Sequence, residues 1–334
     1  MSLSPQHAFY PADSAGKRIR KSPRWDDEGV AATVGTIMAL LVFLTFFGMF
    51  TNQFVPIWMS DNESTHMTQA VQQFSALKSQ VDITISNSAN ALIAPSPIFV
   101  PITLSSDGIP VFAAATAGIL SFMPTGINNK PWMNLSFTYI SDTSGLPVSI
   151  GPSNDGRSGG SLELYSPNRY YVEQHIVYEN GAVIVNQTDG EFIVAGPQFV
   201  VKNLGTSAAP ARVVMITQIT LQGSNVTIGG TGSKGINADL LYSGTTAYGN
   251  DDGSSLTIQL VTKHGWAWYN YFMSRLNNTA DLSPGSGFAM DEPVLHAFTD
   301  STRNYYTLQL TIEDVVLLDH TRATVKVAIG ELGL

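Results

Sequence analysis

The chain has 334 residues, a formal net charge of −9 and no cysteine. The acidic balance argues against nucleic acid as a partner, and the lack of cysteine excludes disulfides, thiolate metal sites and thiol nucleophiles. Charged residues make up only 13% of the chain, while Gly, Ser, Thr and Asn are abundant, which is typical of surface β-proteins and unlike a charge-rich cytosolic enzyme.

The first sixty residues predict a cytoplasmic leader followed by a membrane-spanning helix. Residues 1–29 are polar and contain too few apolar side chains to order a domain. From Val30 to Ser60 there is no charged residue, and the part up to Phe50 is nearly all apolar, long enough as a helix to cross about 30 Å of hydrocarbon. Five Lys and Arg residues precede this run between positions 17 and 24, so the positive-inside rule places the N-terminus in the cytoplasm and most of the chain outside.

The predicted membrane helix covers residues 30–58, with membrane lipid as its first partner. Ala31, Gly35 and Ala39 recur every four residues on one face of this helix. Small side chains let a second helix approach closely, which favours self-association through this segment. The alternative is that these residues reflect only the general abundance of Gly and Ala in membrane helices.

A helical stalk is predicted over residues 59–94. Pro56 removes a backbone donor, so we expect the preceding helix to kink or break near Val55. Beyond that point, apolar residues recur at helical steps of four and three. They are Met67, Val71, Phe74, Leu77 and Val81. This stripe could pack against the chain's own β region or between neighbouring subunits, and we favour the first.

Beyond Pro95, short apolar or alternating runs are separated by Gly, Pro, Asn and Asp, a pattern that indicates strands joined by tight turns. We expect two β-sandwich-like domains, over residues 95–205 and 206–334. A Gly/Ser-rich insertion is expected at 229–253. The predicted fold class is therefore mainly β with a long N-terminal α-helix.

Local signals add detail to the β region. Asn180-Gly181 and Asp189-Gly190 predict hairpin turns, because these residue types accept positive φ. A short helix is predicted near residues 266–276. Its aromatic face is made of Trp266, Tyr269, Phe272 and Leu276. We favour a core under a covering helix over a sugar-stacking platform, because aromatic side chains dominate ordinary cores.

Motifs for catalysis are missing from the sequence. The six histidines are dispersed without metal-binding spacing, and there is no phosphate loop or nucleophile elbow. We therefore expect no catalytic or cofactor-binding residues, and a protein that is not an enzyme. The turn predicted at Asn250–Gly253 could supply oxygen ligands for calcium, although such acids are more often solvated loop charges.

Five Asn-X-Ser/Thr sequons lie on the predicted outer side, so the chain could be a glycoprotein. They begin at Asn62, Asn134, Asn186, Asn225 and Asn277.

The segment Asp26-Asp27-Glu28-Gly29-Val30-Ala31-Ala32-Thr33-Val34-Gly35-Thr36-Ile37 resembles the N-terminus of archaeal type IV pilins and related surface proteins. In that family a basic leader precedes a hydrophobic helix and is removed by a membrane prepilin peptidase. The resemblance implies cleavage between Gly29 and Val30. It also implies that the helix leaves the membrane for the core of a filament, with the β region outside.

The leading hypothesis is an archaeal pilin-like cell-surface protein, either a filament subunit or a membrane-anchored relative, that acts in assembly and adhesion. The first alternative is an uncleaved single-pass protein that serves as a cell-envelope or ligand-binding module. A third is a tethered extracellular hydrolase, which would require acids with raised pKa values in a cleft beside Trp266 and Trp268.

Overall fold

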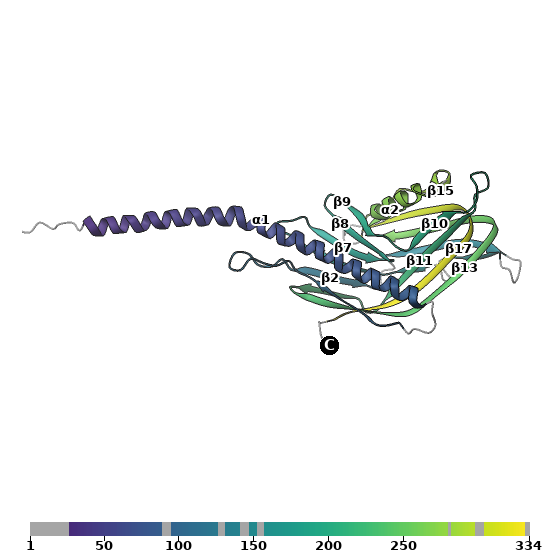
Figure 1. Ribbon diagram of the computed structural model, residues 1–334, viewed down its shortest axis with the longest axis horizontal. Coiled ribbons are helices and arrows are strands. Elements are labelled where there is room, and N and C mark those ends of the chain that lie inside the picture. The colour runs from purple at the N-terminus through teal and green to yellow at the C-terminus, as the bar shows by residue number, and fades with distance from the viewer. Residues whose placement is uncertain are drawn as a thin grey trace, which may run out of the picture. The chain divides into compact units, whose positions relative to one another are not determined.

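The computed structural model describes residues 27–88, 95–125, 131–140, 147–151, 157–279, 282–297 and 304–330, without the side chains at 27–28, 139–140, 147 and 250–253. A long N-terminal helix precedes two mostly antiparallel sheets (Figure 1). The predicted fold class is confirmed. Most of the predicted leader, residues 1–26, lies outside the described part of the chain.

Helix α1 runs from Asp27 to Ser88 with Pro56 inside it. Of the kink or break predicted near Val55, the break is therefore wrong, while the kink stays a prediction. The two helical segments expected at 30–58 and 59–94 are one element as far as Ser88. Proline inside a helix costs about 3 kcal/mol, but Val55 and Met59 beside it are buried, and this packing offsets the lost backbone bond. Contacts divide the chain into unit 1, residues 1–53, and unit 2, residues 54–334.

The larger sheet of unit 2 has eleven strands, six of which form its main series. In spatial order these are β10 (Phe199–Asn203), β11 (Arg212–Gln222), β17 (Tyr305–Gly330), β13 (Ser233–Thr262), β3 (Trp132–Ile140) and β4 (Pro147–Ile150). The other five are β1 (Ile98–Thr103) beside β13, β5 (Arg157–Gly159) beside β3, β15 (Gly287–Met290) and β16 (Val294–His296) beside β17, and β14 (Ser283–Pro284) beside β15. Among the described strands, only β11–β17 and β14–β15 pair in parallel.

Strands β13 and β17 are unusually long, at 30 and 26 residues, and pair with each other from Gly235 opposite Gly330 to Thr262 opposite Tyr306. The Gly/Ser-rich insertion expected at 229–253 is thus wrong, since most of it lies in β13. Glycine and serine have low strand propensity, but β17 supplies a backbone hydrogen-bonding partner along most of the segment, from Gly235 to Gly249.

The smaller sheet has six antiparallel strands. In spatial order they are β12 (Val226–Gly230), β2 (Gly118–Met123), β6 (Ser161–Ser166), β7 (Gln174–Glu179), β8 (Ala182–Gln187) and β9 (Gly190–Ala195). Both predicted hairpins are confirmed, and Asn180 and Gly181 both have positive φ, 44° and 77°. Strands from either side of residue 205 pair in each sheet, as β2–β12 and β1–β13 do, so the boundary expected there does not separate the sheets.

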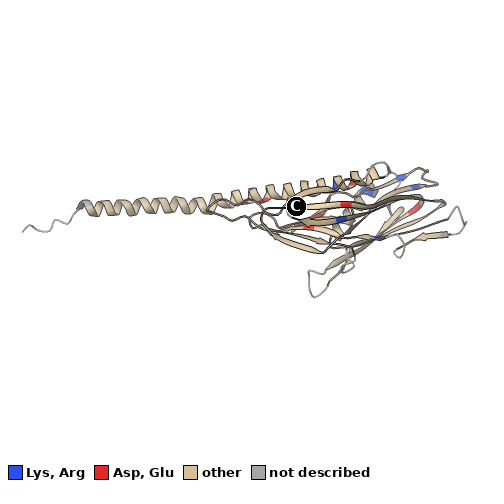
Figure 2. Ribbon diagram, turned by 90° about the horizontal axis from the view of Figure 1, so that it is seen from below, with Lys and Arg blue, Asp and Glu red and all other residues tan. Residues whose placement is uncertain are grey.

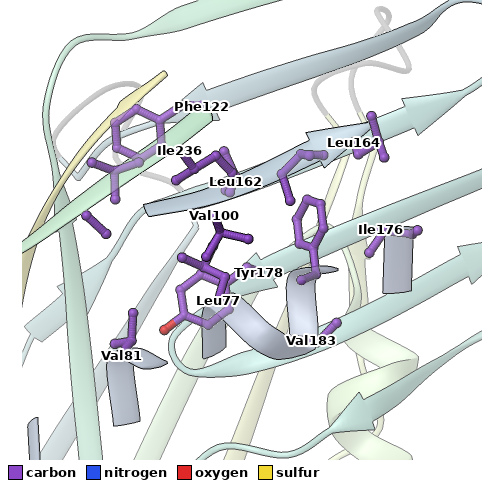
Figure 3. Packing of buried hydrophobic residues seen from close by; sticks show 14 of the residues in the cluster. Leu77, Val81, Val100, Phe122, Leu162, Leu164, Ile176, Tyr178, Val183 and Ile236 are labelled. Carbon is purple, nitrogen blue, oxygen red and sulfur yellow. The ribbon is translucent and has the colours of Figure 1, made fainter. Parts of the chain in front are cut away.

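Two clusters of buried apolar residues hold unit 2 together. The first core combines the stripe of α1 with strands of both sheets, and Figure 3 shows Leu77 and Val81 among Leu162, Ile176 and other strand residues. The prediction that this stripe packs on the chain's own β region is confirmed. In the second core, helix α2 (Gly265–Asn277) packs against strands of both sheets, among them β9 and β17.

Helix α2 confirms the short helix predicted near residues 266–276, but its buried face differs from the predicted one. Trp268, Phe272 and Leu276 lie in the second core, whereas Trp266 is exposed. Only part of the expected aromatic face therefore serves as core.

Candidate anchoring and assembly site

The N-terminal part of α1 exposes a continuous apolar surface. Between Val30 and Phe54 no charged residue occurs (Figure 2), and large apolar side chains such as Val42, which is 70% exposed, project from it. The helix is long and apolar enough to cross a membrane. Apolar surface left in water costs about 25 cal/mol per Å², so this segment requires an apolar environment.

The small-residue face of the helix is open within the described part of the chain. Ala31, Gly35 and Ala39 are exposed, and a Cβ added to Gly35 would meet no atom within 4 Å. Another helix could therefore reach the backbone here, as the predicted self-association requires.

The predicted cleavage point, Gly29–Val30, lies in the first turn of α1, and both residues are exposed. The Gly29 carbonyl accepts a hydrogen bond of 2.7 Å from the Thr33 hydroxyl. A peptidase would have to unwind only this terminal turn to reach the bond.

Glu63, on α1 within unit 2, is wholly buried and fastens two loops to the helix. Its Oε1 accepts hydrogen bonds from the Thr116 hydroxyl at 2.7 Å and the Arg169 amide at 3.1 Å. Its Oε2 accepts from the amides of Tyr170 and Tyr171, both at 2.8 Å. We call this arrangement the Glu63 clamp. It joins the loop between β1 and β2 to the loop between β6 and β7.

The hydrogen bonds of the clamp also control the ionisation of Glu63. Burial alone would raise its pKa, but the bonds from Thr116 and the three backbone amides outweigh burial and leave the pKa below the ordinary 4.5. The carboxylate is thus the stable form in the folded protein. Glu63 was not predicted from the sequence, although it continues the buried stripe in phase, four residues after Met59 and four before Met67.

Further polar contacts fasten α1 to β1 and the loop that follows it. Asn62 Nδ2 donates to the Asp107 carbonyl at 3.1 Å, and His66 Nε2 lies 2.9 Å from the Thr103 carbonyl. Gln73 exchanges two hydrogen bonds with Thr103, one to its hydroxyl and one from its amide. Burial lowers the pKa of His66, so this histidine donates as a neutral ring.

The five sequons differ in accessibility. Asn225 and Asn277 are exposed, Asn134 is buried in β3, and Asn62 and Asn186 are half-buried. The amide of Asn62 is engaged with Asp107, and that of Asn186 lies 3.3 Å from His264 Nδ1. In the folded protein, Asn225 and Asn277 present their amides best.

We expect glycan, if the native protein carries it, at Asn225 and Asn277 and not at Asn134. The reason is that an enzyme acting on the folded chain cannot reach a side chain buried in the middle of a sheet. Mass spectrometry of peptides from the native protein measures the occupancy of each site. Glycan at Asn134 would contradict this expectation and would place modification before folding.

Acids do gather near Trp268, as the hydrolase alternative requires, but they are buried. Glu179 is 4% exposed, and its Oε1 accepts hydrogen bonds of 2.6 Å from the Thr262 hydroxyl and from Trp268 Nε1. Burial raises its pKa. The cavity that Glu179 lines has a volume of about 10 Å³, room for about one water molecule and not for a saccharide.

Glu191 completes this cluster by capping helix α2. Its Oε1 accepts hydrogen bonds from the amides of Trp266 at 2.7 Å and Ala267 at 3.0 Å, and its Oε2 lies 3.1 Å from His264 Nδ1. Burial opposes protonation of His264, but the bond to Glu191 and the nearby carboxylates raise its pKa. These groups satisfy the amides that every helix N-terminus leaves open, which is a structural task.

The segment proposed for calcium, Asn250–Gly253, is not a turn. Its backbone lies in β13, where the pairing register shifts between Gly249 and Ser254, and its side chains are outside the described atoms. Elsewhere in the described chain, no three His, Asp or Glu side chains are grouped so that they could hold a metal. Calcium binding by this segment remains a prediction.

No protein-family model, curated protein or solved structure matches this chain. Function must therefore be argued from its own residues. The most informative are the uncharged run of α1, the open small-residue face and the Glu63 clamp.

Proposed function

We propose that the chain is an archaeal pilin-like cell-surface protein, a filament subunit or its membrane-anchored relative, that acts in assembly and adhesion. One observation carries the proposal. The same helix, α1, exposes apolar side chains from Val30 to Phe54 and then contributes buried residues from Met67 to Ile85 to the core of unit 2. The first part of α1 is therefore suited to contact lipid or other helices. The second part packs against the β-sheets of unit 2, which we call the β body.

We expect assembly because the apolar surface of α1 between Val30 and Phe54 has to be covered. When such a helix leaves lipid, equivalent helices must cover it, because its apolar surface is costly in water. Repeated head-to-tail contacts along an axis cover the helix of each subunit and produce a filament, because such contacts do not close into a ring. The open face at Ala31, Gly35 and Ala39 supplies a place for close helix contact, and the β body then forms the exterior that adheres.

The main alternative is a permanently anchored single-pass module of the cell envelope. It uses the same helix and differs in the fate of the Gly29–Val30 bond. The hydrolase alternative has less support, since Glu179 is buried and Glu191 is half-buried, and both already bond to α2.

N-terminal sequencing of the protein from its native cell surface, in membranes and in filaments sheared from the cells, tests the proposal. A start at Val30 in the sheared fraction supports a processed filament subunit. A start at Met1 or Ser2, with the protein only in membranes, contradicts the filament form and supports the single-pass alternative.

A further inference from the structure

The loop between β1 and β2 carries an exposed apolar tip. No charged residue occurs from Gly108 to Leu120, and backbone hydrogen bonds between Ile109 and Ala113 close the tip into a small hairpin. Val111 at its end is 101% exposed, and Phe112 beside it is also exposed. No described residue shields Val111 from solvent.

The backbone at this tip is strained. Val111 has a φ of 71°, in the left-handed region that β-branched residues avoid. Strained residues persist where the surrounding structure imposes them, and they concentrate at sites that meet a partner. At Val111 an apolar side chain points outward, where no residue of the described part of the chain buries it.

The Glu63 clamp places this tip beside the aromatic part of α1 in unit 2. Thr116, at the end of the loop, bonds to Glu63, and Asn62 holds the Asp107 carbonyl at the loop's other side. Trp58, one helical turn before Asn62 and roughly 6 Å along the axis, is 46% exposed.

The second clamped loop adds an interfacial pair. Glu63 holds the amides of Arg169 and Tyr170, while Tyr170 is 43% exposed and the Arg169 side chain is exposed as well. Tyrosine and tryptophan are enriched where a membrane meets water, and arginine can bind lipid phosphate. Exposed apolar, aromatic and basic side chains thus lie on α1 and on the two loops that Glu63 and Asn62 hold against it.

The length of the uncharged run favours lipid as the partner. As a helix, residues 30–60 would extend roughly 45 Å, about the thickness of a bilayer with both headgroup layers. When Val30 lies at the inner boundary, Trp58 lies in the outer headgroup layer. Asp61 and Asp107 are exposed and limit insertion to the tips.

We propose that unit 2 docks on the outer leaflet of the membrane that holds α1, through Val111 and Phe112 of the first loop and Arg169 and Tyr170 of the second. This inference rests on the proposed function, because it requires a membrane-resident state of the chain. Docking would hold the β body against the bilayer until α1 leaves the membrane. Only after that would a second copy of the chain replace lipid at these side chains.

Because the chain has no cysteine, single labelling sites can be introduced to test this. The full chain carrying Val111→Cys is labelled with an environment-sensitive fluorophore and reconstituted in phosphatidylcholine–phosphatidylglycerol vesicles, with or without headgroup-level nitroxide lipid. We expect the Val111 label to emit at shorter wavelength in the vesicles than in water. We also expect the nitroxide lipid to quench its emission at least about twofold. The matched control is Ser224→Cys, in the exposed turn between β11 and β12, which should show neither effect.

A third variant, Leu44→Cys, separates this inference from the proposed function. One outcome is that nitroxide deep in the bilayer quenches the label at Leu44, while headgroup-level nitroxide does not quench the label at Val111. This outcome would overturn the docking proposal and leave the membrane anchor intact. Failure at both sites would overturn the anchor and the docking together. Energy transfer between Val111 labels on different copies, without lipid quenching, would assign the tip to a second copy and also overturn lipid docking.

Discussion

Replacing Phe74 with alanine should lower the free energy of unfolding of unit 2 by about 4 kcal/mol. Phe74 is 0% exposed at the centre of the α1 stripe and belongs to the first core. The substitution removes its buried apolar area and leaves a cavity between the helix and both sheets. Thermal unfolding of the full chain in detergent should show a midpoint about 10 °C lower.

The matched control is Gln72→Ala, on the exposed side of the same helix. It should change the free energy of unfolding by no more than about 0.5 kcal/mol. Equal stability of the Phe74→Ala variant and the wild type would mean that the helix is not part of the core, contrary to the packing in Figure 3.

The substitution Glu63→Gln should cost about 2–3 kcal/mol and loosen the two clamped loops. A glutamine can keep its amide oxygen toward the backbone amides of Arg169, Tyr170 and Tyr171, so what the substitution removes is the negative charge that strengthens these bonds. Bonds to a charged group are worth about 1.5–3 kcal/mol. Hydrogen exchange at the amides of Tyr170 and Tyr171 should accelerate most.

The same clamp has a predictable pH dependence. The pKa of Glu63 is lowered from 4.5 in the folded state, so its stabilising contribution is complete above about pH 4.5 and declines as the pH falls toward the lower, folded value. Denaturant titrations between pH 7 and 3 should show this loss in the wild type and a smaller one in Glu63→Gln. Asp61 is an exposed neighbour, and Asp61→Asn is the control. If Asp61→Asn reduced the pH-dependent loss of stability as much as Glu63→Gln does, a specific role of the Glu63 clamp would be refuted.

Periodicity and turn chemistry predicted much of the fold. The stripe from Met67 to Val81 repeats at helical steps, and burial of one helix face depends on that spacing alone. The Asn180–Gly181 hairpin was also predictable, because both residues tolerate the positive φ that the turn needs. Both signals are local, so neither depends on what the rest of the chain does.

The errors came where tertiary packing overrides local preference. Pro56 is tolerated in a helix that buries Val55 and Met59 on either side of it, and the segment at 229–253 becomes a strand because β17 pairs with most of it. Glu63 looked like an ordinary surface acid, since its partners at Thr116 and Arg169 are more than fifty residues away. Only its phase in the apolar stripe could have identified it.

The position of β17 constrains how the protein can be made. It is the last described strand of the chain, yet it lies between β11 and β13 in the larger sheet. Translation must therefore reach this strand before that sheet can close. Until then, β11 and β13 both present open edges, which invite pairing with other chains. In the membrane-anchored state that we propose, α1 would keep each nascent chain attached to the membrane while β17 is still emerging.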